Sequence, residues 1–236
     1  MATTVKDLLN RVLTNLGEDE IGSSVTTLTE MYHKQLLGFL NTIKAEVEAA
    51  AQWRALQTTS TVTVTAATTS TTISWANERS RVVRVQDAQS EMLIPLVFDT
   101  TTAASPFQLQ EVDLPWLVYQ ETLNAGISQS YPVSFALINT AGDVLQLRTF
   151  GPASTDRTVQ LTLVVPQARF ATSDLAVTVS IPTDVLELGT TWYAMEERGE
   201  ELGESGMFSE QRYRNALDAA AARDTEEQGG MDLVPV

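Results

Sequence analysis

Five glutamates within nine residues form the densest group of side chains in this sequence that could do chemistry. They are Glu196, Glu197, Glu200, Glu201 and Glu204. Paired carboxylates can hold a divalent cation or serve as the acid and base of a glycosidase. Their spacing is that of a helix, however, whereas metal loops favour Asp, Asn and Gly in a turn. We therefore interpret the cluster first as the solvated or lumen-facing side of a helix, and next as a surface for a basic partner.

The single histidine, His33, is a weaker candidate for chemistry. A lone histidine cannot make a multi-histidine metal site, and a general base needs an orienting acid that the sequence does not identify. The chain has no cysteine, which excludes a disulfide framework and a cysteine-based zinc site. Serine-hydrolase, zincin and nucleotide-binding motifs are also absent. We expect His33 to be solvated or to face a partner, and we predict no catalytic residue, metal or cofactor, and hence no enzyme.

Charge and hydropathy exclude further classes of protein. The 236 residues carry a net charge of −15, with a pI near 4.4. A protein that grips nucleic-acid phosphates, or docks on an anionic membrane, needs clustered Lys and Arg instead. No apolar run reaches the roughly 18 residues of a membrane span, and the start "MATTVKDLLNRV" lacks the apolar core of a signal peptide. The composition suits a protein that lies beside DNA without adhering to it.

Helices are predicted at both ends of the chain. The first covers about residues 4–16, with Thr4-x-x-Asp7 as a capping box and Gly17 as its stop. The second begins near Thr27, where Thr27-x-x-Glu30 repeats the capping pattern. It extends to about Arg54, a length of roughly 40 Å at about 1.5 Å per residue.

The glutamates belong to a third predicted helix, which begins at Thr183. Its apolar stripe packs against the first two helices and consists of Val185, Leu188, Trp192 and Met195. "GESG" at 203–206 is expected to break this helix. A last helix then covers about residues 207–224, with Phe208, Tyr213 and Leu217 turned inward.

Between the helical segments the sequence is β-rich. "TTSTVTVTAATTSTTISW" from residue 58 alternates, is dominated by Thr and predicts a hairpin with its turn around residues 66–70. Further strands are predicted over 81–86, 92–98, 133–139, 144–150, 158–165 and 176–181. The segment 105–125, interrupted by Pro115, predicts a short helix and a loop.

The fold class is therefore α+β: a bundle of N- and C-terminal helices with an inserted antiparallel β-rich domain. We expect the bundle to comprise residues 1–57 and 183–226, the insertion residues 58–182, and an extended tail residues 227–236. Core positions are expected for Trp53 and Trp192, and an exposed interface anchor for Trp116.

This order of segments resembles the head-to-tail adaptor, or connector, proteins of tailed bacteriophages. The match covers nearly the whole chain: "TVKDLLNRVLTNLG", "LLGFLNTIKAEVEAAAQWRAL", "VLQLRTFGPASTDRTVQLTLVV", "IPTDVLELGTTWYAMEERGEELGE" and "QRYRNALDAAAARDTEEQ". The resemblance implies a structural virion protein of the neck, assembled in the host cytoplasm into a ring, commonly of twelve copies. The ring would join the portal protein to a downstream tail or nozzle protein, and DNA would pass through it without specific binding.

Three surfaces are predicted to carry this function. The apolar tail would bind the portal through Met231, Leu233, Val234 and Val236, because an apolar peptide after a Gly-Gly step can order on binding. The glutamates 196–204 would line the channel or an interface. The Thr-rich strand with Thr61, Thr63 and Thr65, together with Trp116, would face neighbouring subunits or the tail. The alternatives are another tail-associated interaction protein, such as a fibre or adhesin-like β module, and less favourably a cell-wall hydrolase using the glutamates.

Overall fold

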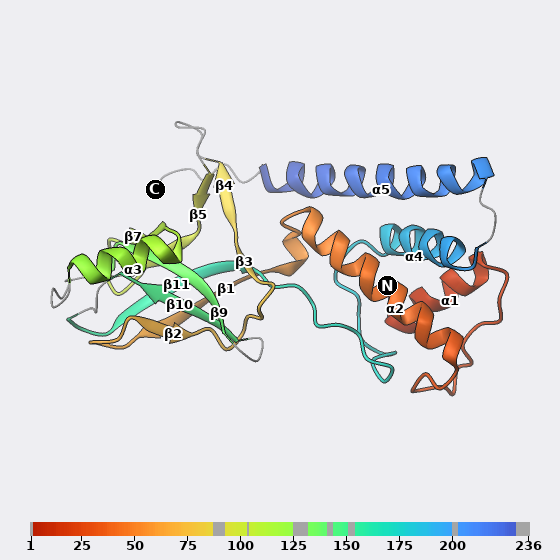
Figure 1. Cartoon of the computed structure of the whole chain (residues 1–236), viewed down its shortest axis with the longest axis horizontal. Helices are drawn as coiled ribbons and strands as arrows, with labels where there is room; N and C mark the ends of the chain where they lie inside the picture. The colour runs from red at the N-terminus through yellow and green to blue at the C-terminus, as the bar shows by residue number, and fades with distance from the viewer. Residues whose placement is uncertain are drawn as a thin grey trace. The chain divides into compact units, whose positions relative to one another are not determined.

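The computed structural model (Figure 1) divides the chain into two compact units, here called the helical unit and the β unit. The helical unit comprises Met1–Leu56 and Gln167–Val236, and the β unit comprises Gln57–Pro166. The structure describes residues 2–86, 93–102, 104–124, 132–140, 144–150, 154–199 and 203–229, without the side chains of 203–207 and 226–229. Helices and antiparallel sheets occur together, which confirms the predicted α+β class. None of the helices in the described part is long and apolar enough to span a bilayer.

Helix α1, Val5–Asn15, forms as its capping pattern predicts. The Thr4 hydroxyl accepts from the Asp7 amide at 3.2 Å, and an Asp7 carboxylate oxygen accepts from the Thr4 amide at 3.1 Å. Gly17, with a φ of +70°, follows the C-terminus in the left-handed conformation that favours glycine. The buried face of α1 consists of Val5, Leu8, Leu9, Val12 and Leu13.

Helix α2, Met31–Ala50, is shorter than predicted. The expected start at Thr27 is wrong, because Glu30 is the N-cap residue and it makes no side-chain capping bond. Leu28 lies in the preceding loop, 2 % exposed, and its amide donates to the Thr172 carbonyl at 3.0 Å. A 20-residue helix is roughly 30 Å long at about 1.5 Å per residue, and a short 3-10 helix, Arg54–Leu56, follows.

Helices α4, Thr183–Glu197, and α5, Gly203–Gly229, complete the helical unit. The predicted start of α4 at Thr183 is confirmed, and α4 contacts α1, α2 and α5. The predicted break at 203–206 is wrong in its details, because α5 already begins at Gly203. Phe208, expected to be inward, is 71 % exposed, whereas Tyr213 and Leu217 are buried as predicted.

Three polar side chains of α2 fasten the segment that returns from the β unit. The Asn41 side chain exchanges two hydrogen bonds with the backbone of Phe170, at 2.9 and 3.0 Å. The Lys44 ammonium donates to the Gln167 carbonyl at 2.7 Å, and the Glu48 carboxylate accepts from the Gln167 amide at 2.9 Å. Lys44 and Glu48 also pair with each other at 2.9 Å, and their side chains are 1 % and 2 % exposed. We call Asn41, Lys44 and Glu48 the buried polar clamp. The segment that begins at Gln167 is held to α2 by these side chains and not by regular secondary structure.

The strand predicted over 176–181 is wrong. The segment forms a single isolated bridge, between Thr4 and Thr178. Its backbone instead bonds to the start of α1: the Val5 amide donates to the Val177 carbonyl, and the Val179 amide donates to the Thr3 carbonyl, both at 3.0 Å. Residues 167–182 therefore belong to the helical unit, where they pack along α1 and α2.

The β unit is built from short strands and one helix. The strands are β1 Gln57–Val64, β2 Ser70–Thr72, β3 Arg81–Val82, β4 Arg84–Gln86, β5 Leu93–Pro95, β6 Val97–Asp99, β7 Phe107–Gln108, β8 Gln110–Glu111, β9 Ser134–Thr140, β10 Val144–Thr149 and β11 Arg157–Val164, and the helix is α3 Leu114–Leu123. One sheet has the order β1-β11-β6-β7 with β3 also on β11, a second has β2-β10-β9-β8, and β4 pairs with β5 alone. The predicted bounds of β9, β10 and β11 agree with the structure to within one residue. The run predicted over 81–86 is divided into β3 and β4, and the run over 92–98 into β5 and β6.

The predicted Thr-rich hairpin is wrong, although its turn exists. Ala67 has a φ of +62°, and the Thr68 amide donates to the Thr65 carbonyl at 3.1 Å. Strand β1 then pairs with β11 over eight residues, and β2 pairs with β10, so the two strands belong to different sheets. The eight-residue ladder with β11 satisfies far more backbone groups than a three-residue β2 could.

The core of the β unit lies between its two sheets. The cluster consists of Val62, Val64, Ile73, Val82, Val97, Leu109, Phe135, Leu145, Leu147, Val159, Leu161 and Leu163. Helix α3 lies on the other face of β9, where Leu117 packs with Ala136 and Phe150. Pro115 stands in the first turn of α3, which a proline tolerates because its missing amide needs no partner there.

Candidate interaction surfaces

The glutamate cluster lies at the end of α4, where two of its members are described. Glu196 and Glu197 are exposed in the last turn of the helix. Glu200 and Glu201 lie outside the described residues, and Glu204 is in α5 with its side chain undescribed. Among the residues that the structure describes, no group of three or more His, Asp or Glu side chains is placed to hold a metal ion.

Arg198 joins three segments next to these glutamates. Its guanidinium donates to Glu18 at 2.7 Å and to the hydroxyl of Tyr32, and it lies 4.8 Å from the centre of the Tyr32 ring. The loop after α1, the start of α2 and the end of α4 therefore meet at one arginine. The exposed carboxylates around it, here called the acidic end, are Glu18, Asp19, Glu20, Glu30, Glu196 and Glu197.

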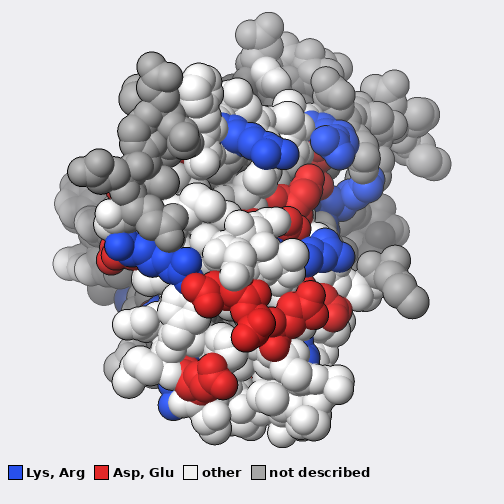
Figure 2. Space-filling model, turned by 90° about the vertical axis from the view of Figure 1, so that its right-hand side faces the viewer, with Lys and Arg blue, Asp and Glu red and all other residues white. Residues whose placement is uncertain are grey.

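Figure 2 faces this end of the helical unit and shows acidic side chains gathered across it. Much of the charge of the chain resides in this unit, which has 21 acidic and 10 basic residues, a net −11. The β unit has 9 acidic and 5 basic residues, a net −4. Exposed carboxylates have the same sign of charge as a phosphate backbone, and they repel it within a Debye length of about 8–10 Å. The acidic end can therefore repel nucleic acid at short range and attract a basic surface.

His33 is mostly buried within the chain, so of the two expected placements full solvation is not observed, and contact with a partner stays a prediction. Its side chain is 14 % exposed, and its Nδ1 lies 3.4 Å from a carboxylate oxygen of Glu30. Both residues are in the region where α2 begins. The histidine is thus a half-buried neighbour of the acidic end.

The two tryptophans predicted in the core of the helical unit pack there to different extents. Trp53 is 2 % exposed and donates its indole N–H to the Val47 carbonyl. Trp192 is half-buried and stacks on the Tyr213 ring with centroids 5.8 Å apart. The stack of Trp192 on Tyr213 connects α4 with α5, whereas Trp53 closes the end of α2.

In the β unit, the predicted interface residues lie on opposite outer faces of the sandwich. Thr61, Thr63 and Thr65 are exposed, and they alternate with Val62 and Val64, which point into the core. Trp116 is 43 % exposed on α3, with its ring 6.4 Å from that of Phe150. Because α3 covers the outer face of β9, the structure does not bring Trp116 and the threonines together.

Helix α3 exposes several apolar side chains, whereas only Trp116 was predicted to be exposed there. Besides Trp116, its exposed side chains are Val118 at 42 %, Tyr119 at 59 % and Leu123 at 61 %. The signal was present in "LPWLVYQETL", because the consecutive residues Trp116, Leu117, Val118 and Tyr119 cannot all lie on one buried face of a helix. Such a patch indicates a contact surface.

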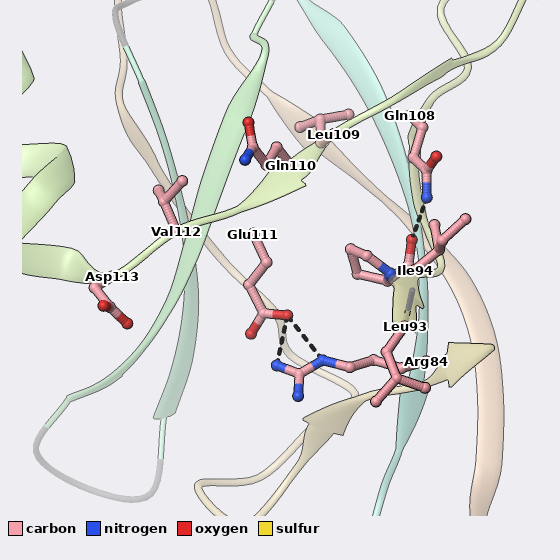
Figure 3. Close-up of a pocket in the computed structure, with 10 residues that line it drawn as sticks. Arg84, Leu93, Ile94, Gln108, Leu109, Gln110, Glu111, Val112 and Asp113 are labelled. Atoms are coloured by element: carbon pink, nitrogen blue, oxygen red, sulfur yellow. Dashed lines mark hydrogen bonds and ion pairs between the residues drawn. The ribbon is translucent and has the colours of Figure 1, made fainter. Parts of the chain in front are cut away.

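A groove of about 630 Å³ opens beside these elements in the β unit (Figure 3). Arg84 on β4 reaches across it to Glu111 on β8, with nitrogen to oxygen distances of 2.8 and 3.3 Å. The side-chain amide of Gln108 donates from its Nε2 to the Pro95 carbonyl at 2.9 Å. The lining also contains the carboxylates of Glu111 and Asp113, and Glu111 is engaged by Arg84. One ion pair and one hydrogen bond thus join the two sides of the groove.

The predicted portal-binding residues of the tail fall outside the described part of the chain. They are Met231, Leu233, Val234 and Val236. Their assignment stays a prediction.

Comparison with protein families gives one match, over nearly the whole chain. The family model described as SU10 adaptor protein matches residues 3–233. No curated protein matches the sequence. The match spans both the helical unit and the β unit.

Proposed function

The chain belongs to the SU10 adaptor protein family, a family of bacteriophage structural adaptors, and from this we propose that it forms a ring joining the portal vertex to the tail. The observation that carries the proposal is the family match over residues 3–233, since it includes both units. In this role the protein extends the DNA channel, seals a joint and provides a platform for the next tail or nozzle protein. The mechanism is mechanical, with no chemical step.

The acidic end supports the part of the proposal that concerns DNA. Glu196 and Glu197 are exposed beside Glu18, and Arg198 neutralises little of their combined charge. In a ring, each such surface is repeated once per subunit around the axis. A channel lined in this way repels phosphates at distances below about 10 Å, so DNA passes during packaging and ejection without adhering.

The apolar tail is the proposed portal anchor. It follows Gly229, the last residue of α5, and four of its seven residues are Met231, Leu233, Val234 and Val236. An apolar peptide that orders on binding loses conformational entropy at that moment, so it binds strongly only where a matching groove exists. The β unit, with its threonine strand and the exposed face of α3, is then left for neighbouring subunits and the tail.

The anchor is tested by deleting residues 230–236, which leaves α5 complete. We expect the truncated protein to keep the circular dichroism spectrum of the full chain and to lose binding to purified portal rings in a pull-down. A variant of unchanged length, with serine at positions 231, 233, 234 and 236, should behave in the same way. Normal portal binding by both would show that the anchor lies elsewhere.

Ring formation is tested separately, by electron microscopy of the full chain with and without portal. Rings with cyclic symmetry are expected at least in the presence of portal, since the high like charge of the subunits opposes assembly without a template. Portal complexes that contain single, asymmetrically bound copies would contradict the ring while leaving the anchor intact.

A further inference from the structure

The outer strand of the larger sheet, β1, has an open edge whose geometry can be derived from its neighbour β11. Thr162 of β11 directs both peptide groups away from β1: its amide donates to the Leu96 carbonyl at 3.0 Å, and its carbonyl accepts from the Val83 amide at 2.9 Å. Thr162 lies opposite Thr59 in the ladder. Their pair is therefore of the non-hydrogen-bonded type, in which both residues turn their peptide groups outward.

Thr158 of β11, four residues before Thr162, also directs both of its peptide groups away from β1. Its carbonyl accepts from the Thr100 amide at 2.8 Å, and its amide donates to the Thr101 hydroxyl at 2.9 Å. Thr158 lies opposite Thr63. The alternation of an antiparallel ladder then places the peptide groups of every second residue of β1 at the outer edge.

The outward residues are Gln57, at the start of the strand, and Thr59, Thr61 and Thr63. The Thr63 carbonyl already accepts from the Thr71 hydroxyl, at 2.9 Å. For Thr59 and Thr61, no partner of the peptide N–H or C=O occurs within the described part of the chain. Two residues in the middle of an eight-residue strand thus present two donors and two acceptors to whatever lies beside them.

This edge lacks the devices that natural proteins use to prevent pairing. Exposed edges are normally blocked by a charged side chain, a proline, a bulge or a very short strand. The ladder of β1 with β11 is continuous over eight pairs, and no charged residue or proline occurs from Gln57 to Asn77. An edge of this kind is a template for another strand.

The matching strand is present in a second copy of the chain. A partner must offer a free edge of similar length, and the other strands at sheet edges in the described residues, β2, β3, β4, β5, β7 and β8, have only two or three residues. In addition, a chain of net charge −15 approaches its own copy at least cost through an uncharged surface. We propose that two copies of the protein pair through β1, antiparallel and edge to edge, about a two-fold axis at Ser60.

The open groups fix the register of this pair. With the axis at Ser60, Thr59 lies opposite Thr61 of the second copy and Thr61 opposite Thr59 of the second copy, which makes four hydrogen bonds. An axis at Thr61 would instead require the Thr63 carbonyl, which the Thr71 hydroxyl already occupies. The two-fold contact uses the same surface on both copies, so assembly through β1 stops at a dimer. Neither copy of the dimer then has an open β1 edge.

The pair is expected to be weak, because two short strands bury much less than the roughly 1,200 Å² of a standard specific interface. It stands independently of the proposed ring, whose head-to-tail contact would use surfaces other than the β1 edge, such as the exposed outer face of the threonines or that of α3. Sedimentation velocity of the full chain from about 10 µM to 1 mM should show a monomer that converts to a dimer, without larger species. A protein that stays monomeric throughout this range would overturn the proposal.

A cysteine cross-link tests the register, and it is unambiguous because the natural chain contains no cysteine. Ser60→Cys places two thiols in a non-hydrogen-bonded pair across the axis, where side chains approach most closely. The matched control is Thr58→Cys, which is more exposed but lies four residues out of register with its own copy. Under mild oxidation we expect the position 60 variant to form disulfide-linked dimer at least tenfold faster. Equal rates would indicate random collision and would contradict the pairing.

Proline at position 61 tests the hydrogen bonds. The Thr61 amide faces outward, so Thr61→Pro keeps the ladder with β11 and removes one donor in each copy. We expect a folded protein whose dimer dissociation constant rises at least tenfold, whereas Val62→Pro breaks the ladder itself. Thr61→Lys provides a second variant if the proline alters the fold, since it places like charges across the axis. Dimerisation unchanged in both position 61 variants would overturn the proposal.

Discussion

At the scale of single residues, the polar contacts of Asn41, Lys44 and Glu48 have a direct consequence for stability. The Lys44 ammonium has its three donors satisfied by Glu48, the Gln167 carbonyl and the Ala168 carbonyl, and it lies 5.0 Å from the centre of the Phe170 ring. A buried ion pair adds little stability when compared with apolar residues, but removing one member leaves an uncompensated charge. Lys44 is therefore the member of the clamp whose removal leaves a buried charge, that of Glu48, without its cation.

Lys44→Met should lower the free energy of unfolding by about 3 kcal/mol, because Glu48 then remains buried without a cation. Denaturant titration monitored by circular dichroism gives this value. The control is Arg11→Met, whose partner Glu187 lies 3.9 Å away and whose side chain is 51 % exposed. An exposed pair of this kind contributes less than about 1 kcal/mol. Similar losses in the two variants would contradict the role assigned to the clamp.

Tyr213 gives the helical unit a predictable response to high pH. Burial raises the pKa of its hydroxyl well above the ordinary value, and the neighbouring Glu46 carboxylate raises that pKa further. The unfolded chain ionises near pH 10, so the free energy of unfolding falls as the pH rises above about 10. Tyr213→Phe should match the wild type at pH 7 within about 1 kcal/mol, since the buried hydroxyl makes no hydrogen bond within the described residues.

Above pH 10 the Tyr213→Phe variant should become the more stable protein, because it has no buried hydroxyl to ionise. Unfolding titrations at pH 7, 10 and 11 measure the difference. Tyr119→Phe is the control, since Tyr119 is 59 % exposed on α3. A wild type that loses no stability relative to Tyr213→Phe at pH 11 would contradict this assignment.

At the scale of elements, the close contact of α4 with α2 and α5 depends on a glycine. A Cβ atom at Gly189 would lie 2.6 Å from Ile43 Cγ2 and 2.7 Å from Tyr213 Cε2. Only a residue without a side chain lets the three helices approach this closely. The glycine is therefore retained in α4 although it lowers helix propensity by about 1 kcal/mol relative to alanine.

Gly189→Ala should destabilise the protein by about 1–3 kcal/mol through overpacking, despite the gain in helix propensity. Gly38→Ala is a matched control in α2, because nothing lies within 4 Å of the Cβ position there. It should stabilise the protein by about 0.5–1 kcal/mol. Thermal unfolding of the two variants should therefore shift in opposite directions, and a shift of the same sign would refute the packing argument.

The sequence predicted those elements whose signals are local. The capping box at Thr4 and the helical period after Thr183 specify α1 and the start of α4, and alternation specifies β9 to β11. Two local signals failed, the capping pattern at Thr27 and the predicted break at 203–206, and the other failures concern partners distant in sequence. The choice of β11 over β2 as the neighbour of β1, and the replacement of strand 176–181 by bonds to Thr3 and Val5, depend on contacts formed across more than 90 residues.

The same distinction holds for the candidate surfaces. The exposure of Glu196 and Glu197 followed from helical spacing, as did that of Trp116 from its place beside a proline. Arg198 was not predicted to join Glu18 and Tyr32, because those residues are 180 and 166 positions away. The exposed α3 residues were missed although their composition indicated them.

At the scale of the whole molecule, the uneven charge has a functional consequence in the proposed ring. The helical unit carries −11 and the β unit −4. If the acidic end lines the channel, reversing its charge creates a basic surface repeated once per subunit. Such a surface binds phosphates, and the binding weakens steeply as counterions are added.

Rings carrying Glu196→Lys and Glu197→Lys should retain linear duplex DNA at about 50 mM salt and release it near physiological ionic strength. The matched control is Glu78→Lys with Asp113→Lys, which makes the same change in net charge at exposed positions of the β unit. Filter binding across a salt series compares them with the wild type. Equal retention by the two variants would show that the glutamates at 196 and 197 do not face the channel.

The pairing of β1 with β11 also determines how this protein can diversify. Gln57, the first residue of the β unit, lies opposite Val164, two residues before its last. Cα atoms in such pairs are about 5 Å apart, so the unit enters and leaves the chain at nearly one point. An insertion with adjacent ends can be exchanged without rebuilding its host. Recombination at Leu56 and Gln167 would therefore replace the β unit with a new module while the helical unit, with its clamp and its packed glycine, is inherited unchanged.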